Sequence, residues 1–253
     1  MLKNARRHAT QRHLWRRSRR VTNHLDILCA GGFRAAMEAL APRFEAAHGL
    51  RLALTFATPA ATRAHLEAGL PFHAGVVVAS VLAKAQADGL ATPAQNFKLA
   101  VSPLGLGTPE GGPALSVATL ADLGATITAL ESIALSDPKA GTNVANEVMA
   151  AADKLGLGEV LRARAIFING PGSVVSGAVA QGHAQAVITL SSEIVPIEGI
   201  RFVGRLPQEM QTEYAMQALV ADAAPPVALA LMDYLRGEEA RDIMRGVGLE
   251  PVG

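Results

Sequence analysis

Short runs of apolar residues alternate along the chain with longer segments in which apolar positions repeat at helical spacing. Residues 25–30, 50–56 and 76–78 predict three strands, and the second alternates apolar with polar side chains, as a half-buried strand does. The helical stripe after the first strand consists of Phe33, Met37, Leu40 and Phe44. Because strands and helices alternate in this way, we expect a parallel sheet with crossover helices.

The pattern restarts after Pro113. The restart predicts strands at residues 132–135, 165–168, 184–189 and 200–203. Residues 214–220 predict a strand that returns the chain to the first unit, and two helices follow it. We therefore expect an α/β protein with two lobes, residues 25–103 with 218–253 and residues 104–217. Each lobe is expected to be a mixed, mostly parallel sheet flanked by helices.

Small and polar residues follow the predicted strands. In open α/β sheets, the loops at the carboxyl ends of the strands face the ligand crevice. The candidate ligand-binding residues in these loops are Gly31, Gly32, Thr58, Ser80, Thr142, Ser173, Thr189 and Ser191. We expect the fold to bring them to one cleft.

The loop from Ser136 to Asn143 has the composition of an anion site. Gly141 lets the backbone approach a guest closely, and Thr142 or Asn143 can cap the helix that follows. The free N–H groups and the partial positive charge at a helix start attract an anion. An ordinary α/β loop with a capped helix explains the same residues, so this loop alone leaves both interpretations open.

Charge is distributed unevenly. Residues 1–24 carry eight Lys or Arg and no acid, so the rest of the chain has 15 basic and 22 acidic residues. The basic segment could contact nucleic acid or a membrane, but Trp15 is the one aromatic residue that interleaves its charges, fewer than a nucleic-acid arm needs. We expect a disordered leader or upstream sequence included by a wrong start codon. No apolar secretory segment follows its arginines.

Metal and redox chemistry have little support in the sequence. The single cysteine, Cys29, excludes an internal disulfide and a cysteine cluster, and the seven histidines lack metal-ligand spacing. We expect no bound cofactor or metal.

The order of these motifs resembles the type II periplasmic solute-binding proteins, in particular the molybdate-binding branch, over about residues 25–251. The features that carry the resemblance are the loop from Ser136 to Thr142, the helix start at Gly172, Ser191-Ser192-Glu193, Glu239-Ala240 and Gly248-Leu249-Glu250-Pro251. It implies two lobes joined by two crossover strands that clamp a small anion through backbone N–H groups and hydroxyls. It also implies a periplasmic protein that passes its ligand to an ABC permease, although a cytoplasmic location stays open because no signal peptide is visible. We expect a monomer without a nucleic-acid partner.

Two loops depart from the family's pattern. The first loop, Ala30 to Phe33, lacks the usual serine, and the second keeps Thr58 but continues with Pro59, which has no N–H to donate. These departures widen the expected ligand from molybdate to larger, flatter or organic anions.

An enzyme is the alternative. A cleft that binds a carboxylate could isomerise a small unsaturated di- or tricarboxylate if a base were present, and Asp137 and Glu193 are the candidates. A turn-forming aspartate and a surface or capping glutamate explain the same two residues. Because no catalytic constellation is visible, we favour the binding protein.

Overall fold

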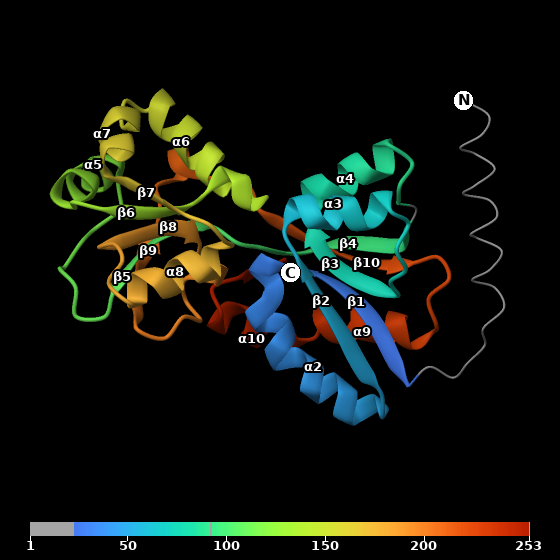
Figure 1. Cartoon of the computed structure of the whole chain (residues 1–253). Coiled ribbons are helices and arrows are strands. Elements are labelled where there is room, and N and C mark those ends of the chain that lie inside the picture. Colours follow the sequence, from blue (N-terminus) through green and yellow to red (C-terminus); the bar gives the residue numbers. More distant parts are fainter. Residues whose placement is uncertain (1–22, 92, 253) are drawn as a thin grey trace.

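The computed structural model describes residues 23–91 and 93–252, so most of the basic segment 1–24 lies outside the described residues. The described chain forms two β-sheets that lie side by side, each covered by helices (Figure 1). We call the six-stranded sheet with its helices lobe 1 and the five-stranded sheet with its helices lobe 2. The predicted α/β, two-lobe fold is confirmed.

Lobe 1 contains a mixed sheet in the order β11-β4-β10-β3-β1-β2. Its strands are β1 (His24–Ala30), β2 (Arg51–Ala57), β3 (Ala74–Val78), β4 (Pro93–Val101), β10 (Ala215–Ala221) and β11 (Glu250–Pro251). Strand β1 pairs in parallel with β2 and β3, whereas β10 runs antiparallel to β3 and β4. The carboxyl ends of β1, β2 and β3 therefore share one edge.

Lobe 2 contains a mixed sheet in the order β7-β6-β8-β5-β9. Its strands are β5 (Leu104–Pro109), β6 (Ile133–Ser136), β7 (Ala165–Ile168), β8 (Ala186–Leu190) and β9 (Ile200–Arg205). Strand β6 pairs in parallel with β7 and β8, so the loops after these strands also share an edge. Strand β5 runs antiparallel to β8 and β9.

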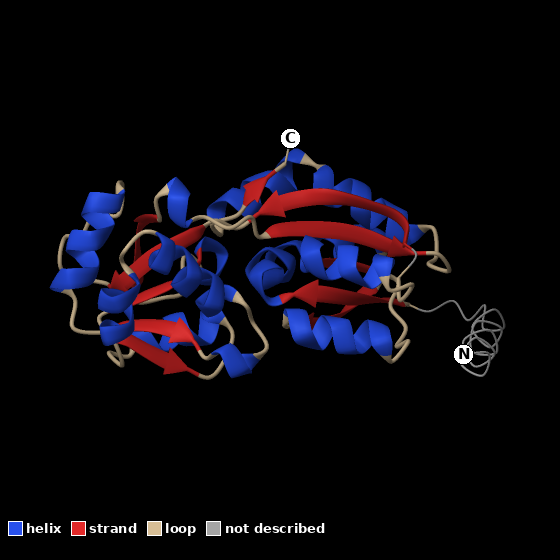
Figure 2. Cartoon of the chain, turned by 90° about the horizontal axis from the view of Figure 1, so that it is seen from above, coloured by secondary structure: helices blue, strands red, loops and turns tan. Residues whose placement is uncertain are grey.

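Helices cover the sheets of both lobes (Figure 2). The helices of lobe 1 are α2 (Arg34–His48), α3 (Pro59–Glu67), α4 (Ala79–Ala87), α9 (Val227–Arg236) and α10 (Glu238–Gly246). Those of lobe 2 are α5 (Leu120–Ala129), α6 (Val144–Lys154), α7 (Gly158–Arg164) and α8 (Gly172–Ala180). The short 3-10 turns are η1 (Gly31–Phe33), η2 (Pro138–Ala140), η3 (Ser191–Glu193) and η4 (Gln208–Met210). None of the described helices is long and apolar enough to cross a membrane.

The core forms where the apolar periodicity placed it. The predicted stripe is buried, with Phe33 in η1 and its other three residues on α2. The helix ends at His48, and the following Gly49 has the left-handed φ of +64° that ends many helices. Cys29 is fully buried, and burial raises the pKa of its thiol far above the usual range. The thiol is therefore neutral and unreactive.

Two connections join the lobes, from β4 to β5 and from β9 to β10. They run together, because the N–H of Ser102 donates to the carbonyl of Tyr214 at 3.0 Å. Strand β10 lies in lobe 1 from its first residue, Ala215. The lobe boundaries at residues 103 and 217 stay a prediction, because strand ends do not fix where two bodies separate.

Candidate functional site

Three loops of lobe 1 lie at the shared strand edge. Strand β1 leads into Gly31 and Gly32 of η1, and β3 leads into α4 with Ser80, whose side chain is exposed. After β2, Thr58 caps α3 by accepting the N–H of Ala61 at 3.3 Å. The parallel pairing of β1 with β2 and β3 brings these predicted residues together.

The loop before α6, in lobe 2, contacts the second of these loops of lobe 1. Gly141 has a φ of +80°, and a Cβ there would lie 3.1 Å from the Thr58 hydroxyl. The N–H of Ala60 donates to the carbonyl of Gly141 at 3.4 Å. The adjacent Thr142 hydroxyl is buried and has no hydrogen-bond partner among the described residues. An unsatisfied buried polar atom of this kind, next in sequence to the contact between the lobes, is a candidate ligand contact.

The side chain of Glu193 lies at the N-terminus of α8. It follows β8 in η3, only 6% of it is exposed, and the hydroxyl of Thr189 donates to its Oε2 at 3.1 Å. The backbone N–H groups of Gly172 and Ser173 also stabilise the ionised carboxylate. Burial outweighs these hydrogen bonds and raises the pKa of Glu193 to about 7. The predicted donors Thr189 and Ser173 therefore serve a carboxylate of the chain itself.

Gly172 makes this arrangement possible. A Cβ at this position would overlap both Glu193 Oε2 and Thr189 Oγ1. On its other side, Glu193 Oε1 lies 3.9 Å from the place of a Cβ at Gly31, so the carboxylate stands between α8 and the first loop of lobe 1. The Glu193 carboxylate thus lies at the N-terminus of α8 and is buried rather than on the surface.

Two further polar groups were missed by the sequence analysis. The hydroxyl of Tyr214 and Oε2 of Glu147 are buried without a well-formed hydrogen bond. Burial first, and then the nearby Glu147 carboxylate, raise the pKa of Tyr214 well above its usual range. Tyr214 is one of only two tyrosines and precedes the return strand, which was the available signal. Nothing in the spacing of Glu147 distinguished it from a surface residue of α6.

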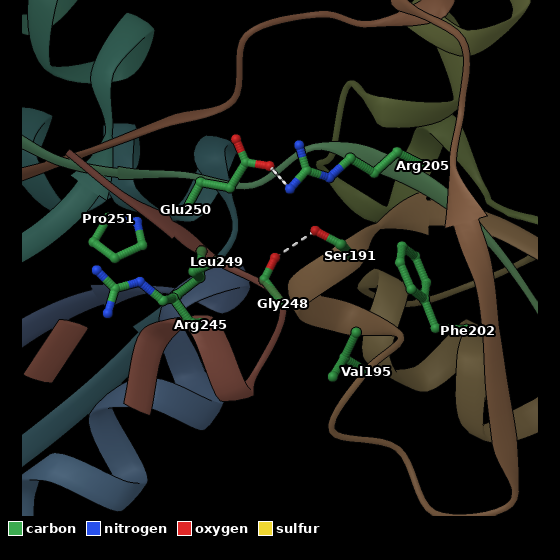
Figure 3. Close-up of a pocket in the computed structure, with 9 residues that line it drawn as sticks. All are labelled: Ser191, Val195, Phe202, Arg205, Arg245, Gly248, Leu249, Glu250 and Pro251. Carbon is green, nitrogen blue, oxygen red and sulfur yellow. Dashed lines mark hydrogen bonds and ion pairs between the residues drawn. The ribbon is translucent and has the colours of Figure 1, made fainter. Parts of the chain in front are cut away.

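Two candidates have other partners. The Ser191 hydroxyl donates to the carbonyl of Gly248 at 2.5 Å, beside a cavity of about 510 Å³ between η3, β9 and the C-terminal segment (Figure 3). Asp137 caps η2 by accepting the N–H of Lys139 at 2.8 Å, which makes it a turn-forming residue. Among the described residues, neither side chain is a hydrogen-bond partner of Glu193. Within the described ranges, no group of three or more His, Cys, Asp or Glu could hold a metal ion.

The sequence comparison decides the family. Residues 25–250 match the family of bacterial extracellular solute-binding proteins. The chain belongs to this family. The solute-binding protein has the fold of the molybdate-binding branch, as the sequence resemblance implied.

Solved structures share this fold. The periplasmic molybdate-binding protein of Azotobacter vinelandii has a TM-score of 0.70 at 21% identity, and the match covers 89% of this chain and 98% of that one. The substrate-binding domain of a putative molybdenum ABC transporter from Clostridium difficile has a TM-score of 0.69 at 18% identity, with 91% and 99% covered. At these identities the likeness shows the fold alone.

A curated relative carries a different name. An aconitate isomerase of Pseudomonas sp. is 27% identical to the solute-binding protein over 235 residues, which cover 90% of this chain and 88% of the isomerase. This relative is named for a reaction, whereas the solved structures above are named for binding or transport.

Proposed function

We propose that this protein binds a small anion between its lobes and delivers it to an ABC permease in the periplasm. One observation supports this most directly, namely the buried, unpartnered hydroxyl of Thr142 at the place where Gly141 meets Thr58 of the other lobe. Burying a hydroxyl without a hydrogen-bond partner destabilises the protein, and an anion that accepts a hydrogen bond from this hydroxyl offsets that cost. Membership of a solute-binding family supports the same conclusion.

The donors of the proposed site are backbone N–H groups and hydroxyls. They come from Gly31, Gly32, Thr58 and Thr142, with Ser80 at the rim. The cation in these loops is Lys139, whose side chain is exposed in the turn of η2. Affinity should therefore depend on helix-start geometry rather than on an ion pair.

Titration calorimetry tests the proposal. The panel comprises molybdate, tungstate, sulfate, malate, citrate and trans-aconitate, with arabinose as a neutral solute and putrescine as a cation. We expect saturable binding of at least one anion, with an affinity that Lys139→Ala leaves unchanged. Binding of the neutral or the cationic solute in preference to every anion would contradict the proposal.

A second function is favoured by two specific observations. The aconitate isomerase relative aligns with nine-tenths of the chain, and Glu193 is a buried carboxylate with a pKa near neutral pH, where a general base works best. The alternative is therefore an isomerase that moves the double bond of a small unsaturated di- or tricarboxylate.

Proton NMR of trans-aconitate incubated with the protein distinguishes these functions. An isomerase converts the substrate steadily, and Glu193→Gln abolishes turnover while the ligand still binds. A binding protein gives saturable complex formation and no product, even at protein concentrations comparable to that of the ligand.

A further inference from the structure

The place of Glu193 bears on which anion the cleft accepts, given the proposed anion-binding function. We propose that Glu193 selects the ligand. Its buried carboxylate opposes fully ionised tetrahedral oxyanions and favours an organic polycarboxylic acid that shares a proton with it.

The helix start that could receive an anion is already occupied. The N–H groups of Gly172 and Ser173 and the hydroxyl of Thr189 stabilise the Glu193 carboxylate, and Gly172 has no side chain that would keep it away. A ligand that enters between Gly31 and α8 therefore meets a carboxylate oxygen rather than a set of free donors.

The described elements in closest contact with η3 offer Glu193 no cation. Arg205 and Arg245 line the cavity on the Ser191 side of η3, but Arg205 pairs with Glu250, and Arg245 pairs with Glu238 and Asp242. Strand β5 and turn η1 carry no charged residue, and α8 contributes its backbone and Ser173. Tyr214 is close enough to feel the charge of Glu193, and it lies beside the carboxylate of Glu147. The next arginine along the chain after η1, Arg34, is exposed, pairs with Glu38 and stacks on Phe56. The surroundings of Glu193 are thus neutral or negative.

A dianion without protons is disfavoured there. Like charges at close range in a low-dielectric site repel strongly. A polycarboxylic acid can avoid this repulsion. One proton held between its carboxylate and Glu193 removes one negative charge and forms a short charge-assisted hydrogen bond. Binding should then take up a proton whenever Glu193 and the free ligand are both ionised.

Calorimetry with citrate, L-malate and molybdate between about pH 7.5 and 9 tests this, because free carboxylic acids of this kind are ionised there. We expect at least one organic acid to bind more tightly than molybdate. Its Kd should rise about tenfold per pH unit, as linkage requires for the uptake of one proton. The observed heat should also vary with the ionisation enthalpy of the buffer. These measurements use the unmodified protein and do not depend on whether a variant folds.

Glu193→Gln should make the organic-acid Kd independent of pH and narrow the preference over molybdate. Glu198→Gln, which changes an exposed glutamate of the same lobe, should leave both unchanged. Organic-acid binding without proton uptake, or tighter binding of molybdate by the unmodified protein, would overturn the selection by Glu193 and leave the anion-binding function intact. Absence of binding by every anion of the wider panel would overturn both.

Discussion

Glu193 links the stability of the fold to pH through a single side chain. Its pKa in the folded protein is about 7, against an ordinary value of 4.5, because burial disfavours the charged form. The folded state therefore keeps a proton that the unfolded state loses between these two pH values. For a group of this kind the free energy of unfolding falls as pH rises through the window, and the full loss is present above pH 7.

We expect the difference in unfolding free energy between the unmodified protein and Glu193→Gln to change by about 3 kcal/mol or less between pH 4.5 and 8. The unmodified protein should lose stability relative to the variant as pH rises, because the glutamine does not titrate. Urea denaturation at a series of pH values measures this difference. A difference that stays constant with pH would show that the carboxylate keeps an ordinary pKa.

A substitution at Thr142 tests the proposed anion contact separately from the stability of the fold. Its buried hydroxyl has no partner, so Thr142→Val should leave the melting temperature unchanged or raise it, while anion affinity falls by about 1–3 kcal/mol. Thr126→Val is the matched control, because the buried Thr126 hydroxyl donates to the carbonyl of Ser116 at 2.6 Å. That variant should lose stability and keep its affinity. The opposite assignment of the two effects would remove Thr142 from the site.

At the scale of one element, α8 depends on a residue without a side chain at its first position. Gly172→Ala should displace Glu193 and Thr189, because the new Cβ would overlap both, and overpacking of this kind costs about 1–3 kcal/mol. Gly177→Ala on the same helix is the control, because its Cβ meets nothing within 4 Å. It should gain up to about 1 kcal/mol from helix propensity. Thermal unfolding of the two variants should therefore shift in opposite directions.

The sequence predicted the helices and strands better than it predicted how these elements pack against one another. Apolar periodicity identified the stripe on α2 and the strands that precede each loop, because burial on one face leaves a pattern within a few residues. Helix α7 was missed, because it is short and carries little periodic signal. The same limit applies to the site. That Glu193 lies at the N-terminus of α8 depends on how β8 and α8 pack, and neighbouring positions in the chain contain no record of that packing.

At the scale of the whole molecule, the lobes also meet on the side of the C-terminal segment. Arg205 of β9 pairs with Glu250 of β11, and the Ser191 hydroxyl donates to the carbonyl of Gly248 (Figure 3). These contacts border the cavity beside η3, whereas the contact of Gly141 with Thr58 lies at the strand-end loops. A change in the angle between the lobes would alter both sets of contacts together. The environment of the C-terminal segment should therefore change when the lobes move relative to each other.

Because Cys29 is unreactive, a dye can be attached to the C-terminal segment alone. Because the chain has one cysteine and it is fully buried with a raised pKa, a maleimide dye should leave the unmodified protein unlabelled under native conditions. Val252→Cys would place a single reactive thiol on an exposed position next to β11. We expect quantitative labelling of this variant and a saturable change in dye emission on adding the preferred anion. Labelling of the unmodified protein, detected by mass spectrometry, would contradict the burial of Cys29. With that background absent, the molecule is a ready framework for a one-dye optical sensor of small anions.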